Sequence, residues 1–215
     1  MSRLVGAVFF LFISSANLFA GTVVLEEGFG LNNACQIPVN WEVQDLLEEE
    51  HEAGSCDWKW RLNQDLDENH TGTDTDDDEG CFVLADSDEC GPETSVDTVL
   101  VTPVIDCTDL SGTSLSFKYD AYEQLDRSSF TVEISTNNGV NWTTVWQQNQ
   151  SDRGPKTATI DLSAEADRQS SVRIRFRYTA SFDWWWQVDD VVVSSSAPFN
   201  WLLFLPAITG GIQRQ

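Results

Sequence analysis

The stretch that decides the fold runs from Val172 to Val193 and reads VRIRFRYTASFDWWWQVDDVVV. In its first half Val172, Ile174 and Phe176 alternate with three arginines, which is the period-2 pattern of a half-buried strand. A short polar turn leads into Trp184–Val193, a run that is apolar on both faces and therefore favours burial between two layers. The stretch predicts two strands, and we expect the rest of the chain to pack around the second.

Two carboxylates, Asp189 and Asp190, lie inside the second run. A bare carboxylate is costly to bury unless a positive charge or a metal ion compensates it. The first interpretation is therefore a nearby cation. The alternative is a β-bulge at which the pair accepts hydrogen bonds from the backbone or from arginine.

Working outward, the chain from residue 98 onward is a series of short strand-like runs separated by turn signals. The runs are Thr98–Ile105, Ser114–Tyr122, Phe130–Thr136, Trp142–Gln148, Lys156–Leu162, Val172–Tyr178 and Trp184–Val193. The turn signals are Ser111-Gly112, Asn137-Asn138-Gly139 and Arg153-Gly154-Pro155. Asn138-Gly139 is the strongest hairpin signal of the chain. Further strands are expected at Thr22–Leu25 and Cys81–Ala85. No convincing amphipathic helix is present, so the pattern predicts an all-β antiparallel sandwich or barrel.

Length and charge narrow the class of protein. A chain of 215 residues is compatible with one domain that has a substantial core. The net charge of −23 argues against nucleic acid or an anionic membrane as the partner. The acidic excess is local, because Glu42–Asp97 holds 20 acidic residues and two basic ones. Within it, Asp65–Gly80 contains two incomplete calcium-loop patterns and is expected to be a long acidic loop insertion.

The two ends of the chain differ from its middle. Residues 1–20, with Arg3 and an apolar run, are typical of a secretory signal peptide. The segment 197–215 is an apolar tail too short to span a membrane, and it is interpreted as a last strand, an assembly element or a surface-attachment signal. The domain is therefore expected over 21–196 of a secreted or cell-surface protein, with no membrane span after signal cleavage.

Five cysteines lie between Cys35 and Cys107, so at least one has no partner within the chain. The pairs closest in sequence are Cys35 with Cys56 and Cys81 with Cys90, which would leave Cys107 over. Sequence alone does not fix this connectivity. An extracytoplasmic location favours disulfides, and no cysteine or histidine spacing typical of a zinc site is present.

Several pieces of the sequence occur together in a fixed order. They are Glu26-Glu27-Gly28-Phe29, Pro38–Trp41 followed by Trp58 and Trp60, CFVLADSD at 81–88, DTVLVTPVID at 97–106, Leu115–Tyr119, FTVEISTNNGVNW at 130–142, and Arg173–Asp190. This ordered set, covering residues 23–193, resembles the choice-of-anchor J or cleaved-adhesin domains, and more distantly MAM domains. The resemblance implies a two-sheet antiparallel jelly-roll sandwich. The chain departs from it in an enlarged, acidic segment at 45–80.

The resemblance also implies structural calcium. In many jelly rolls a carboxylate of the first strand meets one of the last strand, and here these would be Glu26 or Glu27 and Asp189 or Asp190. Further candidate ligands are Asp86, Asp88 and Asp97. Calcium takes six to eight oxygen ligands and would neutralise carboxylates that adjacent strands bring together.

Tryptophan is abundant, with nine residues in the chain, and Trp184, Trp185 and Trp186 are consecutive. In a strand Trp185 must face away from the other two, so one side is a candidate platform on which sugar rings stack; the alternative is packing in the core and at the sheet edge. We therefore expect a non-catalytic binding or adhesion module whose partner is an extracellular glycan or a surface protein. A structural surface subunit assembling through its tail is the alternative. A glycosidase using two carboxylates is the less favoured one, because no catalytic motif is present.

Overall fold

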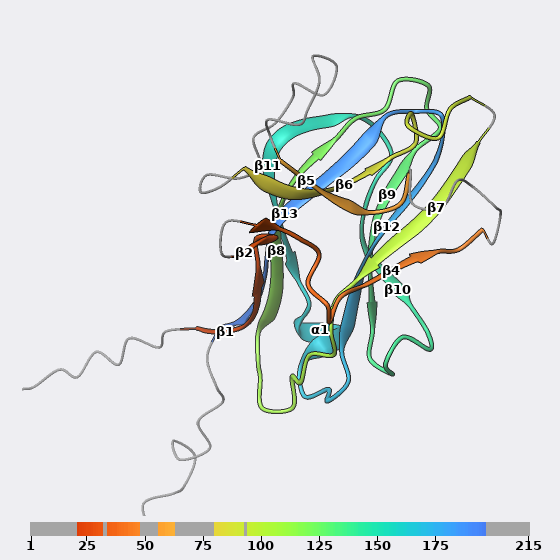
Figure 1. The fold of residues 1–215 in the computed structure, drawn as a ribbon. Helices are drawn as coiled ribbons and strands as arrows, with labels where there is room; N and C mark the ends of the chain where they lie inside the picture. Colours follow the sequence, from red (N-terminus) through yellow and green to blue (C-terminus); the bar gives the residue numbers. More distant parts are fainter. Residues whose placement is uncertain (1–20, 32–33, 48–55, 63–79, 93, 197–215) are drawn as a thin grey trace, which may run out of the picture.

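The computed structural model describes most of the predicted domain (Figure 1). The described residues are 21–31, 34–47, 56–62, 80–92 and 94–196. The signal segment 1–20, nearly all of the acidic loop 65–80 and the tail 197–215 lie outside them, so what was predicted for these segments stays a prediction.

Within these ranges the chain is almost entirely β-structure. Its elements are β1 (Thr22–Glu27), β2 (Gly30–Leu31), β3 (Ala34–Cys35), β4 (Glu42–Asp45), β5 (Lys59–Leu62), β6 (Cys81–Asp86), β7 (Ser95–Val101), β8 (Thr113–Ala121), β9 (Ser129–Ser135), β10 (Thr143–Gln148), β11 (Asp152–Asp161), α1 (Ser163–Ala166), β12 (Arg173–Ser181) and β13 (Trp185–Ser195). The predicted strands are confirmed, with ends that shift by a few residues.

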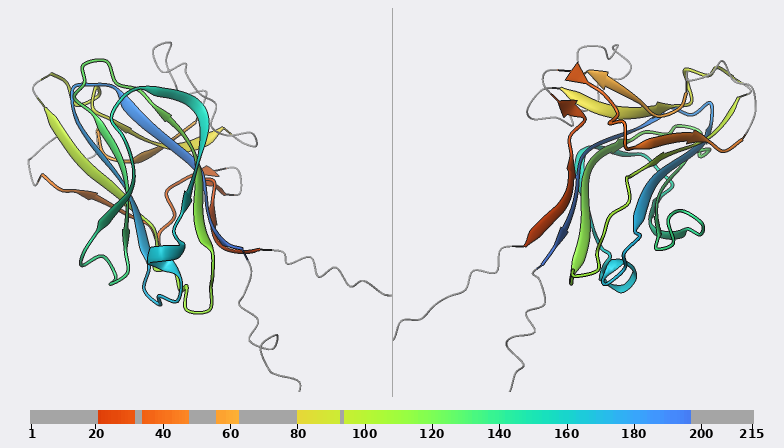
Figure 2. Two further views of the ribbon diagram at one scale, coloured as in Figure 1. Left: turned by 180° about the vertical axis from the view of Figure 1, so that it is seen from behind. Right: turned by 60° about the horizontal axis from the view of Figure 1, so that its bottom comes forward.

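The strands form two antiparallel sheets that face each other across the core (Figure 2). The first, here called the β13 sheet, has the order β11-β8-β13-β6-β5, and β1 also pairs with β13. The second, here called the β12 sheet, has the order β10-β9-β12-β7-β4. A small β2-β3 pair completes the described fold. The predicted two-sheet antiparallel sandwich is confirmed, and the barrel is excluded.

Strand β13 is the central strand, as its apolar faces predict. Its first part, Trp185–Val188, pairs with β6, and its second part, Val191–Ser195, pairs with β1. Strand β8 pairs along the opposite edge. The pairing of Thr22 with Ser195 places the two ends of the described chain side by side, which both views in Figure 2 show.

The alternation read in Val172–Tyr178 is confirmed in β12. Ile174 and Phe176 are fully buried in the core, whereas the arginines point to the outer face. There Arg175 pairs with Glu133 of β9 at 2.6 Å, and Arg177 pairs with Asp97 of β7. The outer face of the β12 sheet is therefore lined with ion pairs between adjacent strands.

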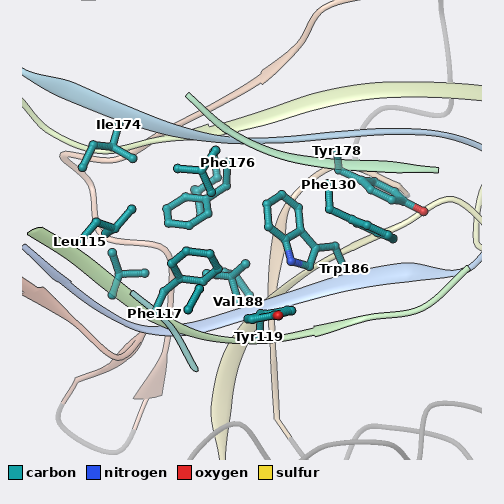
Figure 3. Packing of buried hydrophobic residues seen from close by; sticks show 14 of the residues in the cluster. Leu115, Phe117, Tyr119, Phe130, Ile174, Phe176, Tyr178, Trp186 and Val188 are labelled. Atoms are coloured by element: carbon teal, nitrogen blue, oxygen red, sulfur yellow. The ribbon is translucent and has the colours of Figure 1, made fainter. Parts of the chain in front are cut away.

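The core between the sheets is rich in aromatic rings (Figure 3). Trp186 of β13 packs against Phe176, with ring centroids 5.9 Å apart, and against Trp58 at 5.3 Å. Trp41 and Trp58 also belong to this core, in which they are only 6% and 3% exposed. Both rings fill the space beside Phe29 and Trp186 that the sheets leave open.

The predicted hairpin at Asn138-Gly139 joins β9 to β10. Both residues have positive φ, 58° and 88°, which asparagine and glycine tolerate best. The turn is held by Ser135, whose Oγ accepts the Gly139 N–H at 2.8 Å, and by Asn137, whose Oδ1 accepts the Asn141 N–H. The turn predicted at 153–155, in contrast, lies within β11, where the register with β8 shifts instead of the chain reversing.

Two disulfides are found beside the β5-β6 pair, one at the start of β6 and one beyond its end. They link Cys35 to Cys81 and Cys56 to Cys90, so the four predicted cysteines are bonded but not to their nearest neighbours in sequence. The crossed pairing follows from the fold, because Cys35 ends β3, which lies beside β5, and Cys81 begins β6, the partner of β5. Cys107, the fifth cysteine, is buried and forms no disulfide.

Candidate functional site

The three consecutive tryptophans occupy different environments. Trp186 lies in the main core, and Trp185 lies on the opposite face of the β13 sheet in a small cluster with Phe82 and Leu84. Both are fully buried, so neither ring offers a face to a ligand. Trp184 precedes β13 and packs on the edge of this small cluster with part of its surface exposed. The predicted stacking platform therefore rests on Trp184.

The Trp184 ring is held by side chains of the same corner. It stacks on Tyr122, with centroids 5.1 Å apart and ring planes 24° from parallel. Trp185 supports it edge-on, at 5.4 Å and 90°. The indole Nε1 donates to the Gln124 side-chain oxygen at 3.0 Å. Among the described residues the rings that contact Trp184 are these two, which leaves its face opposite Tyr122 without a ring partner.

The backbone of Trp184 adopts a conformation that bulky residues rarely take. Its φ is 70°, in the left-handed region. Its carbonyl accepts three hydrogen bonds, from the Ser87 N–H at 2.9 Å, the Ser87 Oγ at 3.1 Å and the Tyr178 hydroxyl at 2.6 Å. Such strain persists where the surroundings over-determine the conformation, and it is most frequent at binding and catalytic sites.

Asp183 fixes the loop beside this ring. Its carboxylate is 1% exposed and accepts the backbone N–H groups of Gln124 at 2.7 Å, Leu125 at 2.8 Å and Arg127 at 2.9 Å. The Ser128 hydroxyl donates to the Asp183 backbone carbonyl at 3.1 Å. One buried anion thereby sets the position of residues 124–128 against Trp184.

A second buried carboxylate, Asp120, holds Arg153 over the aromatic rings. It accepts from Arg153 Nε and the Gly154 N–H through Oδ1 and from Trp185 Nε1 through Oδ2, at 2.9, 2.8 and 3.1 Å. The guanidinium carbon lies 4.3 Å from the Tyr122 ring centroid, a cation–π distance. We call Tyr122, Trp184 and Arg153 the aromatic platform.

The predicted acidic meeting point of the first and last strands also forms. Glu26 and Glu27 of β1 pair with β13 next to the bulge that contains Asp189 and Asp190. They line, with Asp190, an open hollow of about 480 Å³, here called the acidic corner. Burial raises the pKa of Glu27. The hydrogen bond that its carboxylate accepts from the Phe29 N–H lowers this pKa, but by less.

The cation facing this corner in the structure is Lys118 of β8. Its Nζ lies 2.9 Å from Asp190 Oδ2. Both interpretations drawn from the Asp pair are therefore partly met, because a positive charge is adjacent and the pair lies at a bulge where Asp190 has φ of 45°. Among the described residues no group of three or more histidine, cysteine or acidic side chains is arranged to hold a metal ion.

The other candidate calcium ligands lie elsewhere. Asp86 of β6 pairs with Trp185 of β13, which precedes Asp189 by four residues. The Asp86 carboxylate accepts a hydrogen bond from the Asp88 N–H. Asp97 belongs to the β12 sheet, where its carboxylate pairs with Arg177. The fold does not bring these three to the acidic corner, because they extend from other strands or the other sheet.

The sequence pattern does not mark most of the aromatic platform. Tyr122 and Asp120 fall within a predicted strand, and Arg153 falls within a predicted turn. A signal existed for Asp120, because alternation in Ser114–Tyr122 places it on the face opposite Phe117 and Tyr119, where a charged group needs a partner. Nothing in the local sequence marks Asp183 as the anchor of a loop some sixty residues earlier.

No protein-family model and no curated protein matches this chain. Among solved structures, the K1 cleaved adhesin domain of Lys-gingipain from Porphyromonas gingivalis W83 has a TM-score of 0.55 at 19% identity, covering 81% of this chain and 99% of that domain. The K3 cleaved adhesin domain of the same protein gives 0.53 at 18% identity, over 81% and 100%. The Stig cyclase Fisc from Fischerella sp. TAU gives 0.51 at 11% identity, over 84% and 100%.

Similarity at these identities establishes the fold. It confirms the β-sandwich that the resemblance to cleaved-adhesin domains predicts, and the same sandwich is found in a cyclase. Within the described residues no helix is long and apolar enough to cross a membrane. The two disulfides are consistent with an extracellular location. The chain is a two-sheet antiparallel β-sandwich whose fold is similar to that of these domains.

Proposed function

We propose that this protein is a secreted or cell-surface, non-catalytic module that binds carbohydrate on the aromatic platform. The observation that carries the proposal is Trp184, a partly exposed indole held in a strained backbone conformation and stacked on Tyr122. A fixed aromatic face with hydrogen-bonding side chains beside it suits the apolar face and the hydroxyl rim of a sugar ring. The adhesin-like fold and the sequence resemblance to choice-of-anchor J domains support a binding role.

The glycosidase alternative has less support at this site. Glycoside hydrolysis needs two carboxyl groups that flank the scissile bond. The two carboxylates that hold the platform, Asp120 and Asp183, are 0% and 1% exposed and accept hydrogen bonds on both oxygens. They support the platform from behind and do not face a substrate.

Binding of the full mature protein to a panel of polysaccharides tests the proposal. Affinity electrophoresis in β-1,4-galactan, xylan, mannan and mixed-linked glucan is expected to show retardation by at least one of them. The Trp184→Ala variant is expected to lose it. Trp60→Ala is the matched control, because Trp60 is 44% exposed and lies in β5, which β6 separates from β13. Equal loss in both variants, or binding only to a surface protein, would refute the assignment.

We further propose structural calcium at the acidic corner, held by Glu26 or Glu27 of β1 together with Asp189 or Asp190 of β13. Such an ion would offset the repulsion between these groups and strengthen the junction of β1 with β13. Calcium at 100 times its dissociation constant is expected to add ~2.7 kcal/mol of stability. Melting in calcium and in chelator measures this, and coincident curves would show that Lys118 alone supplies the positive charge.

A further inference from the structure

We propose that the aromatic platform selects uncharged polysaccharides, and that Asp120 determines this specificity by neutralising Arg153. The inference rests on the proposed carbohydrate-binding function and adds the chemical class of the ligand. In this proposal Arg153 donates hydrogen bonds to the ligand and does not act as an electrostatic anchor for carboxylate or sulfate groups.

Arg153 is a partly exposed member of the platform. Its guanidinium lies over Tyr122, the ring on which Trp184 stacks, and its side chain is 38% exposed. The hydrogen bond to Asp120 uses the Nε donor. Arginine carries five N–H donors, so the terminal nitrogens retain donors for sugar hydroxyls.

Asp120 cancels the charge that would otherwise attract an acidic sugar. Its carboxylate is 0% exposed, and its Oδ1 lies 2.9 Å from Arg153 Nε. A buried partner at this distance is weakly screened by water or salt, so the pair acts on a ligand as a dipole and not as a free positive charge. An anionic ligand gains little from such a pair and still loses its own hydration.

The surroundings add negative charge. The loop beside Trp184 carries Glu123 and Asp126 against Arg127, and the anion of Asp183 lies beneath it. The chain as a whole carries −23. A carboxylated or sulfated polymer is therefore repelled both locally and on approach, whereas a neutral chain encounters no such penalty.

The test compares oligosaccharides that differ only in oxidation at C6. The probes are mannopentaose and cellopentaose, with their uronate counterparts, titrated calorimetrically into the mature protein at 20 and 150 mM salt. We expect at least tenfold tighter binding of the neutral member of a pair and no salt dependence for it. Uronate binding as tight as neutral binding would overturn the inference and leave the proposed function standing. Absence of binding by every probe and by the polysaccharide panel would overturn both.

Two variants separate specificity from folding. Asp120→Asn keeps the shape and an acceptor oxygen but frees the Arg153 charge, so the neutral-to-uronate ratio is expected to fall at least fivefold. Asp126→Asn is the gentler variant, because residue 126 is exposed and its φ of 55° suits asparagine. It is expected to lower the ratio about twofold by removing one nearby negative charge. Unchanged ratios in both variants, with normal melting, would contradict the assigned role.

Discussion

Replacing Asp183 with alanine is expected to have two effects. It destabilises the protein, and it displaces the aromatic platform. In the structure its carboxylate accepts the N–H groups of Gln124, Leu125 and Arg127. Alanine removes both acceptor oxygens and with them all three of these hydrogen bonds. The loop carrying Gln124, which holds the indole of Trp184, then loses its anchor.

The magnitude follows from these contacts. A hydrogen bond to a charged group contributes ~1.5–3 kcal/mol, so three of them amount to about 5–9 kcal/mol before solvation is considered. Residues 124–127 are exposed, and water can replace part of what the carboxylate supplied. We therefore expect a loss of about 3–4 kcal/mol, which for a domain of this size lowers the melting temperature by roughly 10 °C.

Urea denaturation followed by tryptophan fluorescence measures the free energy of unfolding, and near-ultraviolet circular dichroism reports the stacking of Trp184 on Tyr122. Asp109→Ala is the matched control, because Asp109 is exposed and also lies in a loop. The reasoning is refuted if Asp183→Ala unfolds at the same urea concentration as the control, or if it is destabilised while the aromatic signal and glycan binding are unchanged.

Two other predictions concern the cysteines. Replacing both Cys35 and Cys81 with serine opens a loop of 46 residues, for which chain entropy predicts a loss of about 4 kcal/mol; an unaltered urea midpoint would be evidence against this pairing. Burial raises the pKa of the Cys107 thiol to about 11 from 9.0, so the folded protein holds this proton longer than the unfolded chain. Its contribution to stability is therefore complete below pH 9 and is lost as pH rises through 11. Cys107→Ala should flatten that part of the stability profile, and a parallel profile would contradict the assignment.

The sheet framework was accessible from sequence because side-chain periodicity records which face is buried. The alternation of Ile174 and Phe176 with arginines, and the doubly apolar run of β13, each map directly onto a layer of the sandwich. The meeting of Glu27 with Asp190 came from a family resemblance. No local pattern indicates that the first and last strands pair.

The aromatic platform was only partly predictable, because it depends on backbone exceptions. Three consecutive tryptophans suggested one exposed side, but the left-handed conformation of Trp184 takes that residue out of the strand. The Gly154-Pro155 pair is typical of a turn, yet it lies within β11 and carries Arg153 onto Tyr122. These positions result from contacts between distant segments, which single-sequence patterns do not record.

The placement of Trp184 next to the start of β13 has a mechanical consequence. A polymer held at Trp184 would pull at one end of β13, and Ser195 lies at the other end of this strand, roughly 35 Å away. Tension between the two would run along β13, which is flanked by β6 and β1 on one edge and by β8 on the other. Ladder hydrogen bonds perpendicular to that line resist shear together instead of opening one at a time. Force applied between Trp184 and Ser195 would thus load a strand that is hydrogen-bonded along both of its edges.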